Sequence, residues 1–422
     1  MKTILLIGAG KSATVLIQYL IKECEANDWK FLVADADIQQ VLAKTGSSKF
    51  ATAIALDVND DVARENLIQK AHVVISMMPP ALHFLIAKDC VEYRKHLLTA
   101  SYLDEKMKSL KDEINHRKLL FLCEMGLDPG IDHMSAMQLI HRLKKESAII
   151  QSFKSHCGGL IAPESDNNPW HYKISWNPRN IVLAGNAGAV YKEANQIIKV
   201  PYEKIFAGGH QVKVESLETL AWYPNRDSLS YISLYKLPEA TTFIRTTLRH
   251  PQFVKGWHAI VSAKLTNDKN RLAEKNISFK EWSADIQAFV NEENKEMLQY
   301  IGLFKEELIP VAANSNADVL QYLLETALAM LPNDKDMIVM LHEITYKLNG
   351  VSTTLHSSLV VKGENNISTA MAKTVGLPLG IAAKLLLTGE LSLFGLHIPI
   401  TPEIYEPVLK ELKHQGIVFV DH

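Results

Sequence analysis

The sequence CEMGLDPGIDH, residues 123–133, separates two parts of the chain that differ in hydrophobic pattern. The apolar run Leu119–Leu122 precedes it and predicts a buried strand. Three acids, two glycines and a proline then fall within ten residues, which the interior of a strand or helix does not tolerate. We therefore expect a shaped loop at the carboxyl edge of a parallel sheet, where open α/β folds bind ligands. The alternative is a domain linker with solvated acids.

The chain begins with a pattern of strand, glycine turn and helix. The run Thr3–Ile7 is rich in β-formers, and the following loop has the spacing G-x-G-x-x-A before an amphipathic helix. The first glycine allows a tight turn, the second lets the backbone approach a pyrophosphate, and the small alanine lets the helix pack close to the strand. The pattern predicts dinucleotide binding by Gly8, Gly10, Lys11, Ser12 and Ala13.

The next strand, Lys30–Ala34, ends in an acid that bears on the choice of cofactor. Asp35 follows this strand at the distance expected for a carboxylate that accepts from a ribose 2′-hydroxyl. An acid at this position repels a 2′-phosphate. The sequence therefore favours NAD over NADP.

Two further strands, Thr52–Leu56 and Val73–Ser76, end in residues that a doubly wound sheet would place near the cofactor. We expect Asp57 and Val58 near the adenine, and Met77 near the middle of the cofactor. For the methionine, core filling is an equal alternative. With His96–Thr99 and the run before residue 123, six strands alternate with helical patterns. They predict a Rossmann-type doubly wound parallel sheet over residues 1–132.

After His133 the hydrophobic period changes and predicts a helix followed by an α+β domain over residues 133–367. Its alternating runs, which indicate a mostly antiparallel sheet, are Ile149–His156, Gln211–Leu217, Ser230–Leu237, Thr242–Leu248, Met337–Leu348 and Ser352–Val361. Asn349-Gly350 predicts a hairpin turn between the last two. Residues 262–330 are helical in pattern and charged, which suggests a helical part or lid.

Residues 368–422 are expected to return to the dinucleotide domain. Ser368–Leu387 predicts a helix with a break at Gly376 and Pro378. Thr401 is placed to cap a last helix that begins at the following proline.

Composition narrows the classes of protein. A chain of 422 residues is too long for one core, so two or three domains are expected. A formal charge of -2 gives no reason to expect a nucleic-acid or membrane-surface partner. The four cysteines form no Cys-x-x-Cys or metal pattern and fit a reducing, cytoplasmic compartment. No stretch approaches the uncharged length that crosses a bilayer, and no metal site is expected.

Eight blocks of sequence together resemble the saccharopine reductase family, the glutamate-forming saccharopine dehydrogenases of lysine metabolism. They are ASY (100–102), EMGLDPGIDH (124–133), SHCGG (155–159), APE (162–164), YKISW (172–176), YPNRDS (223–228), IRTTLR (244–249) and TPEIY (401–405). The resemblance covers essentially the whole chain. It implies a dinucleotide domain with an inserted substrate and dimerisation domain, a small amino-acid substrate, and a homodimer.

The resemblance also implies a reaction and residues that perform it. Saccharopine would be oxidised by NAD or NADP to an imine, which takes up water and yields glutamate and 2-aminoadipate 6-semialdehyde. Asp128 and Tyr102 are the acid–base candidates. Cys157 and His133 are secondary candidates, for which a small buried thiol and a core or capping histidine are the favoured readings. Ser175 would contact the cofactor. Substrate contacts would come from Ser101, Tyr102, Asp128, Arg226, Thr246 and Thr247.

The three carboxylates of saccharopine require planar, permanently charged donors. Arg226 lies in a polar turn and corresponds to the carboxylate clamp of the family. Arg249 matches less well, and a solvated surface arginine is an equal alternative. Fungal members carry an arginine just past the second strand, where this chain reads VADAD (33–37), and this departure again favours NAD.

Two other functions fit the same architecture. A carboxynorspermidine or carboxyspermidine dehydrogenase would act on a cationic polyamine, and Glu164, Asp166 and Asp227 could face such a substrate. A protein that binds the dinucleotide without turnover is the other alternative. The presence of acid, tyrosine and arginine candidates together argues against it.

Overall fold

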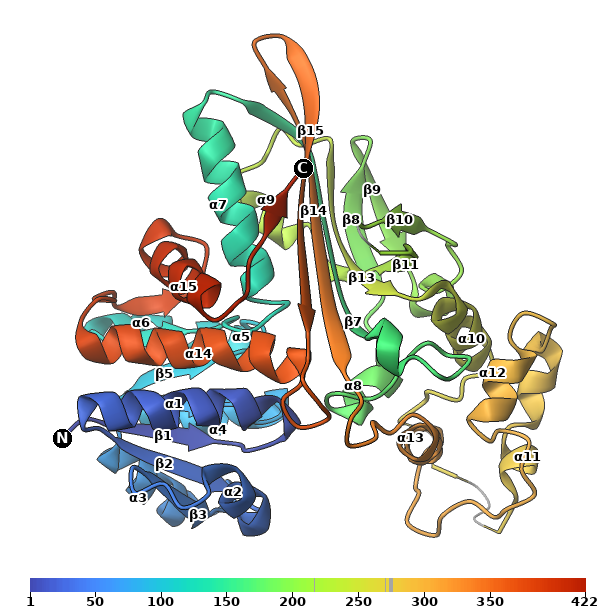
Figure 1. The fold of residues 1–422 in the computed structure, drawn as a ribbon, viewed down its shortest axis with the longest axis horizontal. Coiled ribbons are helices and arrows are strands. Elements are labelled where there is room, and N and C mark those ends of the chain that lie inside the picture. Colours follow the sequence, from blue (N-terminus) through green and yellow to red (C-terminus); the bar gives the residue numbers. More distant parts are fainter. Residues whose placement is uncertain (216, 270, 273–275) are drawn as a thin grey trace. The chain divides into compact units, whose positions relative to one another are not determined.

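The computed structural model describes residues 1–215, 217–269, 271–272 and 276–422, which form two compact units (Figure 1). The first unit comprises Met1–Arg142 and Ile367–Val418. The second comprises Leu143–Asn366 and Phe419–His422. The predicted boundary after Asp132 differs from this division, because it lies inside helix α7.

The first unit is built on a seven-stranded parallel sheet in the order β16-β6-β5-β4-β1-β2-β3. Its strands are β1 (Thr3–Ile7), β2 (Lys30–Asp35), β3 (Ala51–Ala55), β4 (Val73–Ser76), β5 (His96–Thr99), β6 (Leu120–Leu122) and β16 (Gly395–His397). The doubly wound fold and its six predicted strands are confirmed, and β16 adds a seventh strand beside β6. Strands β6, β4 and β1 are buried along their whole length, as expected for a sheet covered on both faces.

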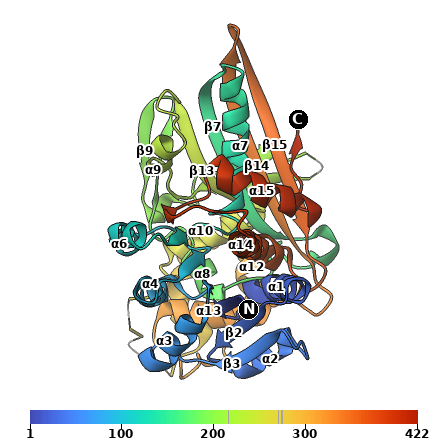
Figure 2. The same ribbon diagram turned by 90° about the vertical axis from the view of Figure 1, so that its left-hand side faces the viewer.

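Helices cover both faces of this sheet, because the connections change face where the strand order reverses beside β1 (Figure 2). Helices α1, α2 and α14 lie on one face, and α3 and α4 on the other. The helices of this unit are η1 (Lys11–Ala13), α1 (Thr14–Asn27), α2 (Ile38–Thr45), α3 (Asp61–Lys70), η2 (Pro80–Leu82), α4 (His83–Glu92), α5 (Glu105–Lys108), α6 (Lys111–His116), α7 (Ile131–Lys145), α14 (Ala370–Thr388) and α15 (Pro402–His414).

Helix α14 is continuous, so the predicted break at Gly376 and Pro378 is wrong. A Cβ at Gly376 would lie 2.9 Å from Leu16 Cβ, which shows that the glycine lets α14 pack closely on α1. This packing outweighs the local preference of proline and glycine to end a helix. By length and composition alone α14 could cross a membrane, but 78% of its apolar window is buried inside the structure.

The second unit is built on a ten-stranded mixed sheet, whose main path is β10-β11-β13-β7-β14-β15-β17. Its strands are β7 (Ile149–Ile161), β8 (Ala189–Glu193), β9 (Gln196–Val200), β10 (Gln211–Lys213), β11 (Thr219–Pro224), β12 (Arg226–Asp227), β13 (Thr242–Arg249), β14 (Asp336–Leu348), β15 (Val351–Lys362) and β17 (Val420–Asp421). The predicted hairpin at Asn349-Gly350 is confirmed, with both residues at positive φ. Residue 216, in the run predicted over 211–217, lies outside the described residues.

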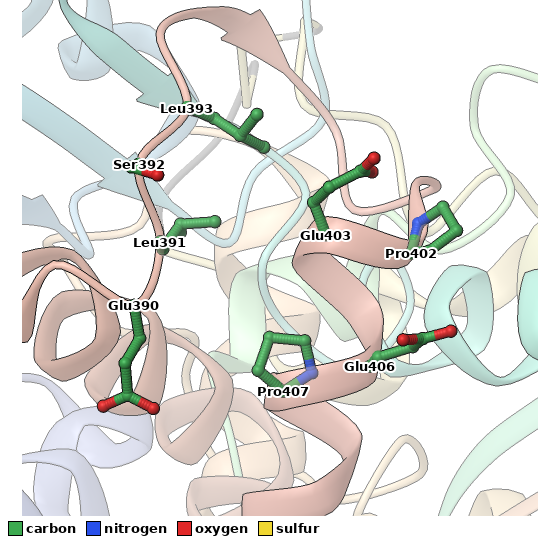
Figure 3. Close-up of a pocket in the computed structure, with 8 residues that line it drawn as sticks. All are labelled: Glu390, Leu391, Ser392, Leu393, Pro402, Glu403, Glu406 and Pro407. Atoms are coloured by element: carbon green, nitrogen blue, oxygen red, sulfur yellow. The ribbon is translucent and has the colours of Figure 1, made fainter.

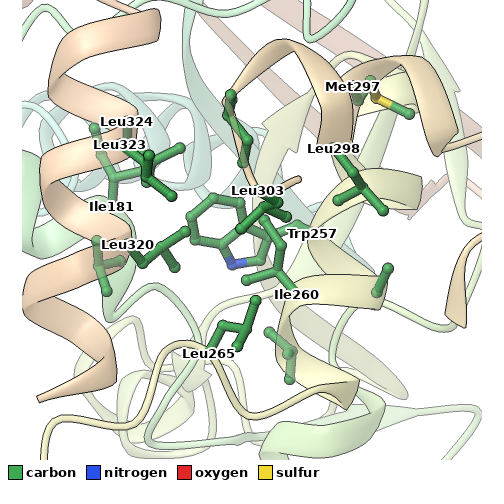
Figure 4. Packing of buried hydrophobic residues seen from close by; sticks show 14 of the residues in the cluster. Ile181, Trp257, Ile260, Leu265, Met297, Leu298, Leu303, Leu320, Leu323 and Leu324 are labelled. Atoms are coloured by element: carbon green, nitrogen blue, oxygen red, sulfur yellow. The ribbon is translucent and has the colours of Figure 1, made fainter. Parts of the chain in front are cut away.

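A hydrophobic cluster around Trp257 joins most of the helices of this unit, but not η3 or α9 (Figure 4). The helices of this unit are η3 (Pro163–Ser165), α8 (Pro178–Val182), η4 (Tyr202–Lys204), α9 (Ser230–Leu234), α10 (Pro251–Ser262), α11 (Phe279–Trp282), η5 (Ala284–Phe289), α12 (Lys295–Tyr300) and α13 (Asn316–Ala327). The last four lie within the predicted helical part, 262–330, of which residues 270 and 273–275 lie outside the described residues.

The strand predicted over Ser230–Leu237 is wrong, because this segment forms helix α9. Asp227 Oδ1 accepts from the backbone N–H of Leu229 and so closes the turn that leads into the helix, at 2.8 Å. Tyr231 and Tyr235, four residues apart, are both buried on one face of it. The hydrophobic pattern of these residues also fits a strand, so the pattern alone did not distinguish a strand from a helix.

Candidate active site

The loop that precedes α7 is shaped by hydrogen bonds within residues 123–133. The backbone N–H of Gly126 donates to Pro129 O at 2.9 Å, and that of Gly130 donates to Asp132 Oδ1 at 2.6 Å. Gly130 has φ +147°, and a Cβ there would lie 2.1 Å from Gly126 O. The predicted shaped loop is therefore present over residues 123–130, and the last three residues of the stretch already belong to α7.

The glycine loop after β1 has the shape that a dinucleotide requires. Gly8 has φ +100°, and a Cβ there would lie 2.9 Å from the backbone of Met77, so only glycine fits. A Cβ at Gly10 would meet no atom of the described chain within 4 Å. The chain itself therefore leaves open space at Gly10, where a pyrophosphate would approach the backbone. Ala13 is fully buried where the helix begins.

Asp35 and Lys44 both hold the glycine loop. Asp35 Oδ2 accepts from Ala9 N at 2.6 Å, and its Oδ1 accepts from Asp37 N at 3.0 Å. Lys44 Nζ, from α2, donates to the carbonyl oxygens of Ala9 and Gly10. Burial lowers the pKa of Lys44 to about 8, and the Asp35 carboxylate partly opposes this.

The other predicted cofactor contacts of the first unit follow β3 and β4. Asp57 is exposed and accepts from Asn59 N at 2.9 Å, whereas Val58 is buried. The carbonyl oxygen of Val58 accepts from the buried Arg64. Met77 is half-buried next to the glycine loop, and its N–H donates to Ile7 O at 2.9 Å.

The two acid–base candidates of the first unit lie close together. Tyr102 Oη donates to Asp128 Oδ1 at 3.4 Å, and both side chains are partly exposed. Glu124, buried and at φ +59°, fixes the loop that carries Tyr102, because its Oε1 accepts from Leu103 N at 3.0 Å. Its Oε2 pairs with His133 Nε2 at 2.8 Å, so His133 is a buried supporting residue.

A buried histidine connects two strand ends beneath the same loop. His83 Nδ1 lies 2.7 Å from Ser76 Oγ, and its Nε2 lies 2.6 Å from Ser101 Oγ. Burial lowers the pKa of His83 to about 4, and Asp104 partly opposes the shift. The predicted substrate contact Ser101 is therefore hydrogen-bonded to a neutral imidazole.

The second unit brings Cys157 and Thr247 side by side. They are register partners on the parallel strands β7 and β13, so their side chains share one face of the sheet. Cys157 is buried, which agrees with the favoured reading of a small buried thiol. Thr246 points to the opposite face, where its Oγ1 lies 2.7 Å from His156 Nδ1, and it is fully buried.

The arginine candidates of the second unit differ in environment. Arg226, on β12, is exposed and has φ +51°. Arg249 is buried, donates to Leu248 O at 2.8 Å and lies 5.4 Å from the Tyr172 ring. The alternative of a solvated surface arginine at 249 is therefore wrong. Ser175 is buried beside the backbone bridge from residue 174 to residue 329.

Within the described ranges, no group of three or more His, Cys, Asp or Glu side chains could hold a metal ion. All four cysteines are buried, and none of them forms a disulfide. A hollow of about 500 Å³ in the first unit lies between α15 and the segment after α14 (Figure 3). Its lining contains none of the predicted site residues and comprises Glu390, Leu391, Ser392, Leu393, Pro402, Glu403, Glu406 and Pro407.

Sequence reasoning missed the supporting residues. Lys44 and His83 lie on helices after strand ends, and Glu124 was quoted without a role. Their contacts span many residues along the chain, up to 35 between Lys44 and Ala9. Lys44, His83 and Glu124 each belong to a segment that follows the carboxyl end of a strand. This position was the one weak sign in the sequence that they could support a ligand site.

Comparison with known families covers both units. Residues 4–121 match the family described as "Saccharopine dehydrogenase NADP binding domain". Residues 126–417 match the family described as "Saccharopine dehydrogenase C-terminal domain".

Individual proteins agree with these matches. The chain is 34% identical to "Saccharopine dehydrogenase [NADP(+), L-glutamate-forming]" of Saccharomyces cerevisiae, over 99% of this chain and 98% of that protein. It is 31% identical to bovine "Alpha-aminoadipic semialdehyde synthase, mitochondrial", but spans only 47% of that protein's length. The crystal structure of apo saccharopine dehydrogenase (L-Glu forming) from Saccharomyces cerevisiae superposes with a TM-score of 0.88 at 32% identity, covering 100% of this chain and 99% of that one.

Proposed function

Because the chain belongs to the saccharopine dehydrogenase family, we propose that it interconverts saccharopine with L-glutamate and 2-aminoadipate 6-semialdehyde, using NAD or NADP, in lysine metabolism. The observation that carries this proposal is the Tyr102–Asp128 pair, which lies in the first unit past the carboxyl ends of β5 and β6. An acid–base pair at this edge of a dinucleotide-binding sheet is what oxidation of a secondary amine requires.

The first unit fits a dinucleotide. Gly8 makes the turn, Gly10 leaves room for the pyrophosphate, and the first N–H groups of η1 and α1 supply an anion site. When bound, the nicotinamide ring accepts the hydride that leaves the substrate carbon. Met77 and Ser175 are proposed as further contacts, together with Asp57, Val58, Lys11 and Ser12.

We assign proton transfer to Asp128 and Tyr102. Oxidation of the carbon–nitrogen bond requires the secondary amine to lose its proton, and hydrolysis of the imine requires a proton to be taken from water. The aspartate and the tyrosine share a hydrogen bond, so either can take up a proton and pass it through the other. A protonated nitrogen then leaves as glutamate when the carbinolamine collapses.

Substrate carboxylates require charged donors, and Arg226 is proposed as their main partner. It is exposed, permanently charged and can bind a carboxylate through two N–H groups. Thr247 and Ser101 carry hydroxyl groups that can add single hydrogen bonds. Thr246 is proposed as a contact through its backbone, because its hydroxyl is turned toward His156.

Replacing Arg226 with glutamine should raise the KM for saccharopine about 10- to 100-fold, because a charge-assisted bidentate contact is lost. Steady-state kinetics would measure it. Arg179→Gln is the matched control, since this arginine instead pairs with Asp318 at 2.8 Å and should leave KM unchanged. Equal KM values in the two variants would contradict the role of Arg226.

Asp35 should make the chain prefer NAD, although the relative from Saccharomyces cerevisiae is named for NADP(+). In Asp35→Asn the repulsion of a 2′-phosphate disappears, so the ratio of the Kd for NADP to the Kd for NAD should fall roughly 10- to 100-fold. Titration calorimetry of both nucleotides at one moderate salt concentration would measure it. Asp28→Asn is the control, because Asp28 is an exposed αL residue at the C-cap of α1. A wild-type preference for NADP would overturn the assignment.

The proposal as a whole is tested by identifying products. With L-saccharopine and oxidised cofactor, mass spectrometry should find glutamate and the semialdehyde in equal amounts. A carboxylated polyamine, offered in parallel, should not be consumed. Consumption of the polyamine alone would replace the proposed substrate.

We also propose a homodimer in the cytoplasm. The four reduced, buried cysteines fit a reducing compartment, and the dimer is an expectation from the family. Sedimentation analysis showing a monomer at micromolar concentration would remove the dimer from the proposal.

A further inference from the structure

Ser76, His83 and Ser101 form a hydrogen-bonded chain that none of the predicted roles uses. The imidazole bridges the end of β4 to the loop after β5, at 2.7 Å to Ser76 Oγ and 2.6 Å to Ser101 Oγ. Ser76 is completely buried and His83 is 6% exposed, whereas Ser101 is half-buried. The hydrogen bonds through these three side chains therefore run from the interior of the first unit toward its ligand-binding edge.

The imidazole is neutral around pH 7, because burial lowers the pKa of His83 to about 4 and Asp104 only partly opposes this. A neutral imidazole has one N–H donor and one acceptor nitrogen. One serine must therefore donate to His83 and the other must accept from it. The direction of both hydrogen bonds, between Ser76 and His83 and between His83 and Ser101, therefore depends on which imidazole nitrogen carries the proton.

Burial of Ser76 determines the direction. In the part of the chain that the structure describes, the hydroxyl of Ser76 has no hydrogen-bond partner except His83. If it accepted from Nδ1, its own proton would be buried and unpaired, which is unfavourable. Ser76 therefore donates to Nδ1, and the proton of the imidazole lies on Nε2, which donates to Ser101 Oγ.

We propose that His83, as the Nε2–H tautomer, is a positioning residue that makes Ser101 a hydrogen-bond donor toward bound substrate. Once Ser101 Oγ accepts from His83, its own proton points away, and the described chain offers that proton no other acceptor. A substrate carboxylate accepts hydrogen bonds but does not donate them, so this direction matches it. The identity of the acceptor as saccharopine rests on the proposed function. The tautomer does not.

The tautomer can be observed directly. In protein labelled with ¹⁵N at histidine, long-range ¹H–¹⁵N correlation distinguishes a protonated from an unprotonated ring nitrogen, and the spectrum of His83→Gln identifies the His83 signals. We expect Nε2 to be protonated and Nδ1 unprotonated from pH 6 to pH 8. A protonated Nδ1, or an imidazole that titrates in this range, would overturn the inference, whether or not saccharopine is the substrate.

The functional consequence requires variants that separate the donor from the packing. His83→Gln keeps an N–H donor at the tip, and His83→Leu removes it at similar volume. We expect a KM for saccharopine near the wild-type value in His83→Gln, and one about 10- to 100-fold higher in His83→Leu. The Kd for the oxidised cofactor should change little in either. A loss of the same size in both variants would mean that His83 acts only through packing.

His96→Leu is the control for loss of another histidine of the first unit, which is half-buried and lies on β5. His96 Nδ1 accepts from Leu120 N at 2.9 Å at the amino end of β5, away from the ligand-binding edge. Its removal should lower stability and leave KM unchanged. Ser76→Ala should let the imidazole adopt both tautomers, visible in the ¹⁵N spectrum, with a smaller rise in KM. A single Nε2–H tautomer in Ser76→Ala would contradict the role given to Ser76.

Discussion

Replacing Asp128 with asparagine should lower kcat for saccharopine oxidation by about 10² to 10⁴, the range found when a general acid–base group is lost. Asparagine preserves the size of the side chain and can still accept from Tyr102, but it cannot take up a proton. The Kd for cofactor should stay within a few-fold of the wild-type value, because Asp128 belongs to the loop over residues 123–130 and not to the glycine loop. Stopped-flow measurement of the hydride-transfer step would separate chemistry from product release.

Two further variants make this result specific. Asp104→Asn removes an exposed carboxylate from the same region, where it caps α5 by accepting from Met107 N at 2.8 Å, and kcat should be unchanged. In the double variant with Tyr102→Phe, the loss should be well below the product of the single losses, because the two groups share one hydrogen bond. Fully multiplicative losses would show that the two residues act separately.

Replacing Gly130 with alanine should destabilise the first unit by about 3–5 kcal/mol. A Cβ would overlap Gly126 O at 2.1 Å, and φ +147° is strained for any residue with a side chain. Overpacking and backbone strain each contribute roughly 1–3 kcal/mol. Urea unfolding followed by hydrogen exchange in peptides from residues 1–142 would measure the change.

Gly46→Ala is the control for backbone conformation alone. Gly46 also has positive φ, at +56°, but a Cβ there would meet nothing within 4 Å. Because its ψ of -142° lies outside the αL region, this variant should cost roughly 1–3 kcal/mol, from backbone strain alone. If both alanine variants lowered the free energy of unfolding equally, the close contact between Gly130 and Gly126 would not be what fixes the shape of this loop.

The sequence predicted the parallel sheet well because its strands are marked by local signals. Thr3–Ile7, Val73–Ser76 and His96–Thr99 are short segments with an apolar centre that turn residues follow, and the structure has strands with these bounds. The hairpin at Asn349-Gly350 was equally readable, because few residue pairs adopt positive φ at both positions.

The wrong or missing predictions concern segments whose structure is determined by tertiary packing. The pattern of Gly376 and Pro378 suggests a helix end, but close contact with α1 keeps α14 intact. Strand β16 is three residues long and gains its stability from pairing with β6, which the local sequence does not reveal. Arg249 is buried against the rings of Tyr172 and Phe253. The residues next to it in sequence therefore did not predict its burial.

The candidate residues of the site could be predicted from the sequence, whereas their hydrogen-bond partners are known only from the structure. Tyr102 and Asp128 were candidates for acid–base work, and the fold of the first unit brings them within 3.4 Å. The residues that orient them and their neighbours, Glu124 and His83, act through contacts between strand ends. Such contacts depend on the sheet order and not on spacing along the chain.

The most direct test of the account is the change in nicotinamide absorbance when the purified protein is mixed with L-saccharopine and either NAD or NADP. We expect reduced cofactor to accumulate only when saccharopine is present, and faster with NAD than with NADP. No change with either cofactor, in protein that calorimetry shows to bind it, would contradict the proposed reaction.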